Sequence, residues 1–144
     1  MPSVTITSTD LQAEGPVMEV HFLIPLQLEK VYLASGSPIP PPVMCKALID
    51  TGASSSVVQD TIPKKLGLSP IGTTSINTAS SQNHPCAQYF IRMVIPAYNL
   101  TYEGVFTSMP LQGQNIDSLI GRDLLGRAIL IYIGYAHQFT LSLL

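Results

Sequence analysis

Short runs of β-forming residues, separated by turn residues, are the feature that most constrains the fold of this 144-residue chain. Several runs alternate apolar and polar residues, as half-buried strands do, and little helical periodicity appears between them. Strands are expected at Val4–Ser8, Val17–Ile24, Val43–Ile49, Ser56–Val58, Ile71–Asn77, Gln88–Ile95, Gly104–Ser108, Ser118–Ile120, Ala128–Ile133 and Phe139–Leu144. Many short strands at close spacing predict an all-β fold, either a small closed β-barrel or a sandwich.

Two segments carry the residues that begin and end a short helix. Asp60 can cap a turn that stops at Gly67, and a second candidate begins near Asp123 and ends around Gly126. We therefore expect one or two short helices beside the strands. The length of the chain suits a single domain over residues 1–144, with an N-terminal hairpin (about residues 1–30) as an extension of it.

The charge of the chain excludes one class of partner and favours another. Charged residues make up only 11% of the sequence, the net charge is −2, and the lysines and arginines are scattered. Without a basic stripe to follow a phosphate backbone, nucleic acid is not an expected partner. The low charge favours an oligomer, because a partner chain can cover part of a weakly charged surface.

The spacing of the cysteines bears on metal binding, and the N-terminal sequence bears on the cellular compartment of the protein. Cys45 and Cys86 lie far apart and flank no CxxC motif or histidine cluster, so we expect no metal site. Free thiols in a reducing compartment are the preferred interpretation, and a disulfide is the alternative. The chain lacks a signal-like start and any apolar stretch near the roughly 20 residues of a membrane helix, so we expect a cytoplasmic protein without a membrane partner.

The segment from Ala47 to Ser56 carries the chemistry. An apolar strand ends at Asp50 and enters a tight turn, in which Thr51 offers a hydroxyl and Gly52 permits close approach of the backbone. Because Asp, Thr, Gly and Ser all form turns, an ordinary surface turn is the competing interpretation of this tripeptide alone.

A second segment adds to the first. Residues Asp117 to Leu125 read as an apolar strand that turns at Gly121 and continues through Arg122 and Asp123 into a helical turn. Together, the two segments resemble the signatures of the retropepsin-like aspartic proteases, which are an apolar-Asp-Thr-Gly-Ala motif and a later Gly-Arg-Asp/Asn motif. The resemblance covers roughly Val43 to Arg127 and implies the retropepsin type of β-barrel, with Gly121, Arg122 and Asp123 as structural residues.

By this resemblance, Asp50 is the catalytic residue of an aspartic endopeptidase that needs no cofactor. Such catalysis uses two carboxylates that share one proton and thereby supply both an acid and a base. The chain has one Asp-Thr-Gly, so the resemblance implies a homodimer of identical chains that acts on a peptide or protein substrate. Thr51 would hydrogen-bond across the dimer, Gly52 would allow close approach, and Ala53, which has no hydroxyl, favours a working pH nearer neutral.

The resemblance also implies which residues bind substrate. Many retroviral members have acidic residues where this chain has Ser54 and Ser55, so Arg122 loses its usual partner and is expected to pair with Asp123, Asp60 or a carboxylate across the interface. The flap that closes over substrate corresponds to Thr78–Ala87. The expected substrate-binding residues are Leu48, Ser54, Ser55, Val57, Ala79, Ser80 and Leu119.

Two alternatives to a protease stay open at this stage. A dimeric module of the same fold could hold a peptide or a protein without cutting it, and the serines at 54 and 55 are compatible with that. An unrelated small barrel that binds a small ligand is the other alternative. The intact Asp-Thr-Gly favours the enzyme, because a binding module does not need paired carboxylates in a strained turn.

Overall fold

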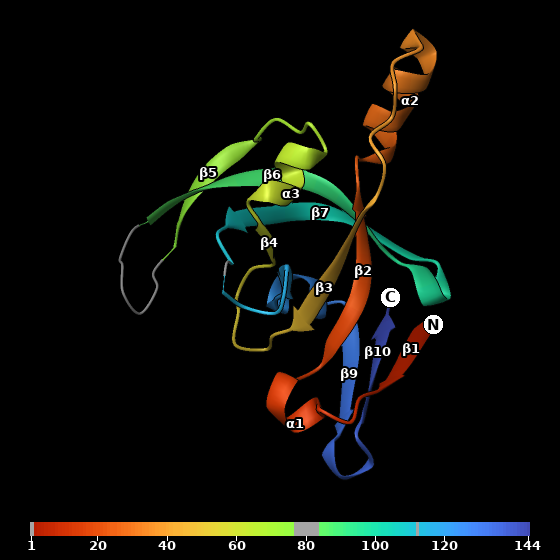
Figure 1. Cartoon of the computed structure of the whole chain (residues 1–144), viewed down its shortest axis with the longest axis vertical. Coiled ribbons are helices and arrows are strands. Elements are labelled where there is room, and N and C mark those ends of the chain that lie inside the picture. Colours follow the sequence, from red (N-terminus) through yellow and green to blue (C-terminus); the bar gives the residue numbers. More distant parts are fainter. Residues whose placement is uncertain (1, 77–83, 112) are drawn as a thin grey trace.

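The computed structural model describes residues 2–76, 84–111 and 113–144 and consists mainly of β-strands (Figure 1). The strands are β1 (Ser3–Thr7), β2 (Val17–Leu23), β3 (Val43–Ile49), β4 (Val57–Gln59), β5 (Gly72–Ile76), β6 (His84–Ile95), β7 (Leu100–Met109), β8 (Ser118–Ile120), β9 (Ala128–Ile133) and β10 (Gln138–Leu143). The helices are α1 (Leu11–Glu14), α2 (Leu26–Ser35), α3 (Thr61–Lys65) and α4 (Arg122–Leu125), with 3-10 turns η1 (Pro96–Tyr98) and η2 (Gly134–Ala136). The predicted all-β class is confirmed.

Most of the strands form a closed barrel. Strands β2, β3, β8, β4, β7 and β6 follow one another in hydrogen-bonded order, and antiparallel pairing of β6 with β2 closes the ring. The pairs β3–β8 and β4–β7 are parallel, whereas the others are antiparallel. Strand β5 adds to the outer edge of β6 and extends the sheet beyond the barrel. The predicted closed barrel is therefore confirmed.

The ends of the chain form a second, three-stranded sheet in the order β1–β10–β9. Strand β1 pairs with β10, while β2 pairs with β3 and β6. The two N-terminal strands therefore lie in different sheets and do not form the hairpin expected for residues 1–30. Local sequence could not reveal this, because β1 finds its partner at the opposite end of the chain.

The core follows from the alternation of side chains along the strands. In β2, Met18, Val20 and Phe22 are buried while Glu19 is exposed, because successive strand residues point to opposite faces. The ring of Phe22 meets the ring of Phe106 edge to face, with their centroids 5.3 Å apart. This apolar interior holds the barrel strands, and with them the turns at their ends, in fixed positions.

Helices α1 and α2 were not predicted from the sequence. Helix α2 has no buried residue, and its apolar side chains do not follow one helical face, so periodicity could not reveal it. It is anchored at its base, where Arg92 donates to the carbonyl of Ile24 and pairs with Glu29 at 3.1 Å. Gly36, at a φ of 72°, ends the helix in the left-handed conformation that glycine adopts readily.

Cys45 and Cys86 are free and buried, in agreement with the preferred interpretation of free thiols. Burial raises the pKa of the Cys45 thiol to about 12, with a further contribution from the negative charge of Asp117. Burial also raises the pKa of Cys86. Among the described residues, no helix has both the length and the apolar character needed to cross a membrane.

Candidate active site

Strand β3 delivers Asp50 to a turn that the neighbouring strand fixes. The amide of Asp50 donates to the carbonyl of Ile120 at 2.9 Å, which continues the parallel pairing of β3 with β8. Within the turn, the amide of Gly52 donates to Oδ1 of Asp50 at 2.8 Å, and the amide of Ala53 donates to the carbonyl of Asp50 at 3.2 Å. The half-buried carboxylate is thus held by its own loop, which leaves Thr51 and Gly52 exposed beside it.

A buried hydroxyl ties the far end of this loop to α4. Ser56 is 1% exposed, and its Oγ donates to Oδ1 of Asp123 at 2.7 Å and accepts from the amide of Gly121 at 3.0 Å. Asp123 also accepts from the amide of Ser56 at 2.9 Å and from that of Leu124 at 2.8 Å. The predicted structural residues of the Gly-Arg-Asp segment therefore hold the loop that follows Asp50.

Gly121 lies where a larger residue would strike the loop backbone. A Cβ added to Gly121 would meet the carbonyl carbon of Ser55 at 2.6 Å and the carbonyl oxygen of Ala53 at 3.0 Å. Backbone cannot move aside without displacing the turn that holds Asp50, so the conflict is not relieved by a side-chain rotation.

We expect Gly121→Ala to destabilise the fold by about 1–3 kcal/mol, in the range of overpacked sites. Chemical denaturation measures this loss. Gly113→Ala is not a suitable comparison, because Gly113 has a φ of 86°, which strains any other residue. Gly126→Ala is the matched control, since its Cβ would approach the carbonyl oxygen of Arg122 only to 3.3 Å. Equal stability of G121A and the parent chain would contradict the close packing of α4 on the loop.

Arg122 binds backbone instead of the carboxylates expected for it within the chain, and Asp117 also has a backbone partner. The guanidinium of Arg122 donates to the carbonyl of Thr51 at 2.7 Å, instead of pairing with Asp123 or Asp60 within the chain. The carboxylate of Asp123 already accepts hydrogen bonds from the amide and the hydroxyl of Ser56, which explains why it does not pair with Arg122. Asp117 accepts from the amide of Lys46 at 2.9 Å, so its carboxylate fixes an edge of β3. Arg122 thereby supports the Asp50 turn through the backbone.

A groove of about 530 Å³ opens beside the Asp50 turn. Its walls come from the loop after Asp50, from the start of β4, from strand β5 and from β7 and β8. The residues that line it are Gly52, Ala53, Ser54, Ser55, Val57, Thr74, Ser75, Ile76, Met109 and Leu119. Strands β5 and β6 pair antiparallel, with Ile76 opposite His84, and the part of the predicted flap before His84 lies outside the described residues. Ala79 and Ser80, which were also expected to bind substrate, lie outside the described residues.

The three apolar residues expected to bind substrate share one face of the sheet. Leu48 pairs with Leu119 across β3 and β8, and Leu119 pairs with Val57 across β8 and β4. Directly opposed residues point to the same face, so the three form a row. Leu48 and Leu119 are half-buried and Val57 is buried, which makes Leu48 and Leu119 the accessible members.

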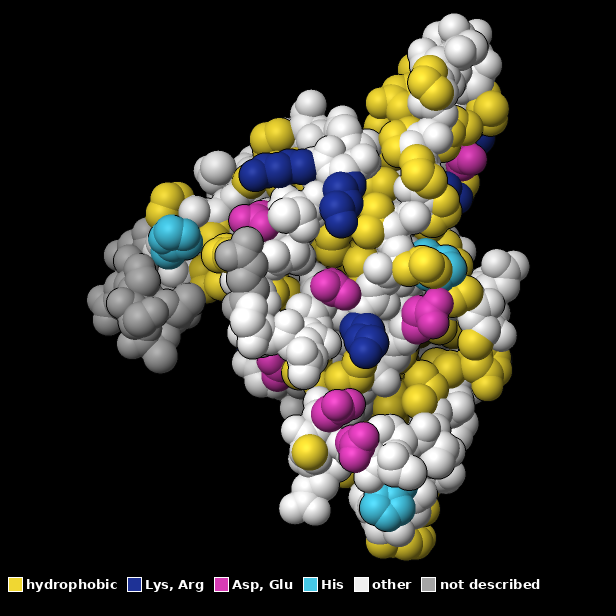
Figure 2. Space-filling view, viewed as in Figure 1, with side chains coloured by type: hydrophobic (Ala, Val, Ile, Leu, Met, Phe, Trp, Pro, Cys, Tyr) yellow, Lys and Arg dark blue, Asp and Glu magenta, His cyan; other side chains and the backbone are white. Residues whose placement is uncertain are grey.

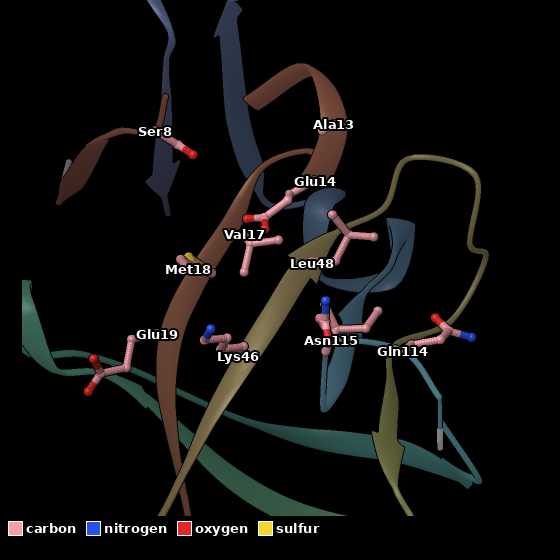
Figure 3. A pocket seen from close by; sticks show the side chains of 11 residues that line it. Ser8, Ala13, Glu14, Val17, Met18, Glu19, Lys46, Leu48, Gln114 and Asn115 are labelled. Carbon is pink, nitrogen blue, oxygen red and sulfur yellow. The ribbon is translucent and has the colours of Figure 1, made fainter. Parts of the chain in front are cut away.

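A second hollow, of about 590 Å³, lies at the Leu48 end of this row. Figure 3 shows its side chains grouped around the end of β3, where Lys46 and Leu48 lie on the strand. The others come from α1 and its flanks, β2 and the loop before β8: Ser8, Ala13, Glu14, Val17, Met18, Glu19, Gln114, Asn115 and Ile116. This hollow lacks the residues of the Asp50 turn, whereas Gly52 and Ala53 of that turn line the groove. The groove is therefore the candidate catalytic cleft.

The carboxylates of Asp50, Asp117 and Asp123 differ in the hydrogen bonds that they accept. Asp117 and Asp123 accept from backbone and hydroxyl donors, whereas Asp50 accepts from the amide of Gly52. Gly52 and Ala53, which follow Asp50 in its turn, line the open groove. Within the described residues, no group of three His, Cys, Asp or Glu side chains could hold a metal ion. The described part of the site thus presents one half-buried carboxylate, Asp50, on a hydrogen-bonded turn beside the groove.

A family model described as "Aspartyl protease" matches residues 42–124, more than half of the chain. The chain belongs to the aspartyl protease family. The match includes both the Asp50 turn and the Gly121–Asp123 segment, which the structure joins through Ser56. The sequence resemblance to retropepsin-like proteases is confirmed at the level of family and fold.

Solved structures are similar to this aspartyl protease family member at low sequence identity. A retropepsin-like aspartic protease from Rickettsia conorii is 19% identical, with a TM-score of 0.56, and the alignment covers 96% of this chain and 89% of that one. The retroviral protease-like domain of Ddi1 from Leishmania major is 14% identical, with a TM-score of 0.47, over 89% and 94% of the two chains. No curated protein matches the chain significantly.

Sequence reasoning missed part of this aspartyl protease site. Ser56 anchors the loop, yet it is the third of three consecutive serines, and nothing local distinguishes it from Ser54 and Ser55. Thr74 and Met109 line the groove only because β5 and β7 come beside the Asp50 loop in space. No signal in the sequence singles them out.

Proposed function

We propose that this aspartyl protease family member is an endopeptidase that acts as a homodimer. The observation that carries the proposal is a single carboxylate, Asp50, held by a turn whose residues Gly52 and Ala53 line an open groove, while Asp117 and Asp123 have other partners. Hydrolysis without a covalent intermediate requires a second carboxylate, and a second copy related by a two-fold axis beside Asp50 supplies it. The domain that performs this comprises residues 1–144.

The two Asp50 carboxylates share one proton and divide the chemistry between them. The ionised carboxylate takes a proton from water while the oxygen of that water bonds to the carbonyl carbon of the peptide. The protonated carboxylate gives its proton to the carbonyl oxygen, which forms a tetrahedral diol. The protonated carboxylate of the pair then gives its proton to the amide nitrogen, and the C–N bond breaks. A hydroxyl of the diol releases a proton as the acid product forms, and this proton restores the single shared proton of the pair.

The groove supports an extended peptide as the substrate. Its wall at β5 is an outer strand of the sheet, and such a strand presents backbone donors and acceptors to a peptide. In the groove, Leu119 offers an apolar contact, whereas Ser54 and Ser55 offer neutral hydroxyls. Leu48, which pairs with Leu119 but lines the second hollow, would extend this apolar surface beyond the groove. We therefore expect apolar side chains beside the cleaved bond. Thr51, exposed next to Asp50, is assigned to contact the opposite loop across the two-fold axis.

A non-catalytic dimeric module that holds a peptide is the second candidate function. It is favoured by one observation, the neutral Ser54 and Ser55 in the groove wall where many retroviral members have acidic residues. Such a module does not need Asp50 to take or give a proton, whereas the protease does.

Incubation of the purified chain with a diverse peptide mixture between pH 4 and pH 8, with cleavage followed by mass spectrometry, tests the proposal. We expect cleavage between apolar residues, at a rate that rises with about the square of protein concentration where dimers are scarce. A rate proportional to concentration over that range would contradict a dimeric enzyme. Binding of peptides by a dimeric preparation that cleaves none of them would favour the non-catalytic module.

A further inference from the structure

The second hollow, which lies beside the candidate catalytic cleft, has an apolar floor. Val17 of β2 and Leu48 of β3 are directly opposed across the two strands, and both line the hollow. Directly opposed residues point to the same face of a sheet, so Val17 extends the apolar row that reaches Val57 in the groove. The hollow and the groove therefore lie on one face of the sheet and are joined by a row of apolar side chains.

Glu14, the last residue of α1, lies at the edge of this floor. A Cβ added to the next residue, Gly15, would meet Cδ1 of Leu48 at 3.0 Å, so the backbone after Glu14 lies against Leu48. The amide of Ile49 donates to the carbonyl of Pro16 at 3.0 Å and fixes this segment to β3. Figure 3 shows the side chains of Glu14 and Leu48 together at this end of β3. Glu14 is thus held next to the strand that leads into the catalytic turn.

The negative charge of Glu14 is not compensated by a basic neighbour. Glu14 is exposed, and within the described ranges no lysine, arginine or histidine forms an ion pair with it. Glu19, the other acidic residue of the hollow, is hydrogen-bonded to His21 and stands directly opposite Lys46 across β2 and β3. Figure 2 shows acidic side chains over α1, whereas basic side chains lie over β3 and α3. The hollow therefore carries its uncompensated charge at Glu14.

A lysine or arginine side chain fits this combination of an apolar floor and a carboxylate. Its aliphatic stem can lie on Val17 and Leu48 while its charged end reaches Glu14. The amide groups of Gln114 and Asn115, which are exposed in the loop on the other side of β3, offer further hydrogen-bond acceptors. An acidic side chain would instead meet Glu14 as a like charge, and an apolar one would leave the carboxylate unpaired.

We propose that the second hollow binds a basic side chain of the substrate and that Glu14 selects it. This rests on the proposed function, because the hollow is assigned to the same peptide that occupies the groove. Neighbouring strands lie about 4.8 Å apart, so the step from β4 across β8 to β3 spans about 10 Å, or about three residues of an extended peptide. The selected residue therefore lies about three positions from an apolar side chain in the groove.

The cleavage of a labelled peptide series tests this selection. The parent peptide is rich in alanine with two central leucines, and its variants carry lysine or norleucine at one position at a time. Norleucine keeps the aliphatic stem of lysine and lacks the charge. At the selected position, we expect lysine to raise kcat/KM about fivefold over norleucine, the upper end for an exposed ion pair. Glu14→Gln should reduce this ratio to about one, and Glu14→Lys should make lysine the poorer residue.

Glu19→Gln is the matched control, because it neutralises the other glutamate of the same hollow. We expect it to keep the lysine preference, since the charge of Glu19 already faces Lys46. Glu14 is exposed and bonds to Asp10 through its backbone amide, so its replacement should leave the fold intact, which thermal unfolding checks. A preference that survives Glu14→Gln, or that Glu19→Gln removes, would overturn the assignment to Glu14.

Fluorescence anisotropy with the same labelled peptides separates this selection from the proposed activity. Cleavage without a lysine preference at any position would overturn the subsite and leave the protease intact. Binding without cleavage, with a lysine preference that Glu14→Gln removes, would support the subsite and contradict the protease. Peptides that are neither bound nor cleaved would overturn both.

Discussion

Replacement of Asp50 by Asn is expected to reduce peptide cleavage by at least about 10²–10⁴-fold, the range of general acid–base contributions. An amide at this position can neither take the proton of water nor supply one, although it keeps the shape of the carboxylate and can accept from the amide of Gly52. The fold should therefore be preserved. Initial rates of cleavage of one peptide, measured for both proteins at equal dimer concentration, give the ratio.

Asp10→Asn is the matched control for this substitution. Asp10 is an exposed aspartate before α1, outside the groove, so its amide should leave the cleavage rate unchanged. Thermal unfolding of both variants checks that they remain folded. Full cleavage by Asp50→Asn would show that the activity depends on other residues or on a contaminating protease, and it would contradict the proposed mechanism.

Replacement of Asp123 by Ala is expected to lower the free energy of unfolding by about 2–4 kcal/mol. The carboxylate accepts from the amide and the hydroxyl of Ser56 and from the amide of Leu124. Because Ser56 is 1% exposed, its donors would lose their partner without full access to water. Urea denaturation, followed by far-UV circular dichroism, measures the loss.

A double-mutant cycle distinguishes this network from general damage. Ser56→Ala and Asp123→Ala both break the hydrogen bond from the Ser56 hydroxyl to Asp123, so their combined loss should be smaller than the sum of the single losses. Asp10→Ala, a substitution at an exposed aspartate, should cost less than about 0.5 kcal/mol. Additive losses in the cycle would contradict the coupling of the Asp50 loop to α4 through Ser56.

The barrel and the Asp50 turn could be predicted because their signals are local. Alternation along β2 and β3 marks half-buried strands, and the tripeptide at Asp50 follows an apolar run directly. The Gly121–Asp123 segment could be recognised for the same reason. The roles of Thr51 and Gly52 in the dimer, and of Leu48 and Leu119 in binding substrate, remain predictions.

The rest depends on contacts that form only in the folded chain. Strand β1 finds β10 at the other terminus, and Arg122 finds the carbonyl of Thr51 because Asp123 is already held by Ser56. Helix α2 is anchored by Arg92 of a distant strand and carries no apolar stripe, so its sequence lacks the period that identifies a surface helix. These features are determined by contacts between distant parts of the chain, which the local sequence pattern does not specify.

The most direct test of paired catalysis is a subunit-mixing experiment with the parent chain and its Asp50→Asn variant. With parent concentration fixed and a fourfold excess of variant allowed to exchange subunits, random association leaves about one fifth of parent subunits in parent homodimers. We predict that cleavage falls to about that fraction, because a heterodimer holds one Asp50 carboxylate. Cleavage that stays at the level of the parent alone, with exchange verified by mass spectrometry, would show that each Asp50 acts without its mate and would contradict the account.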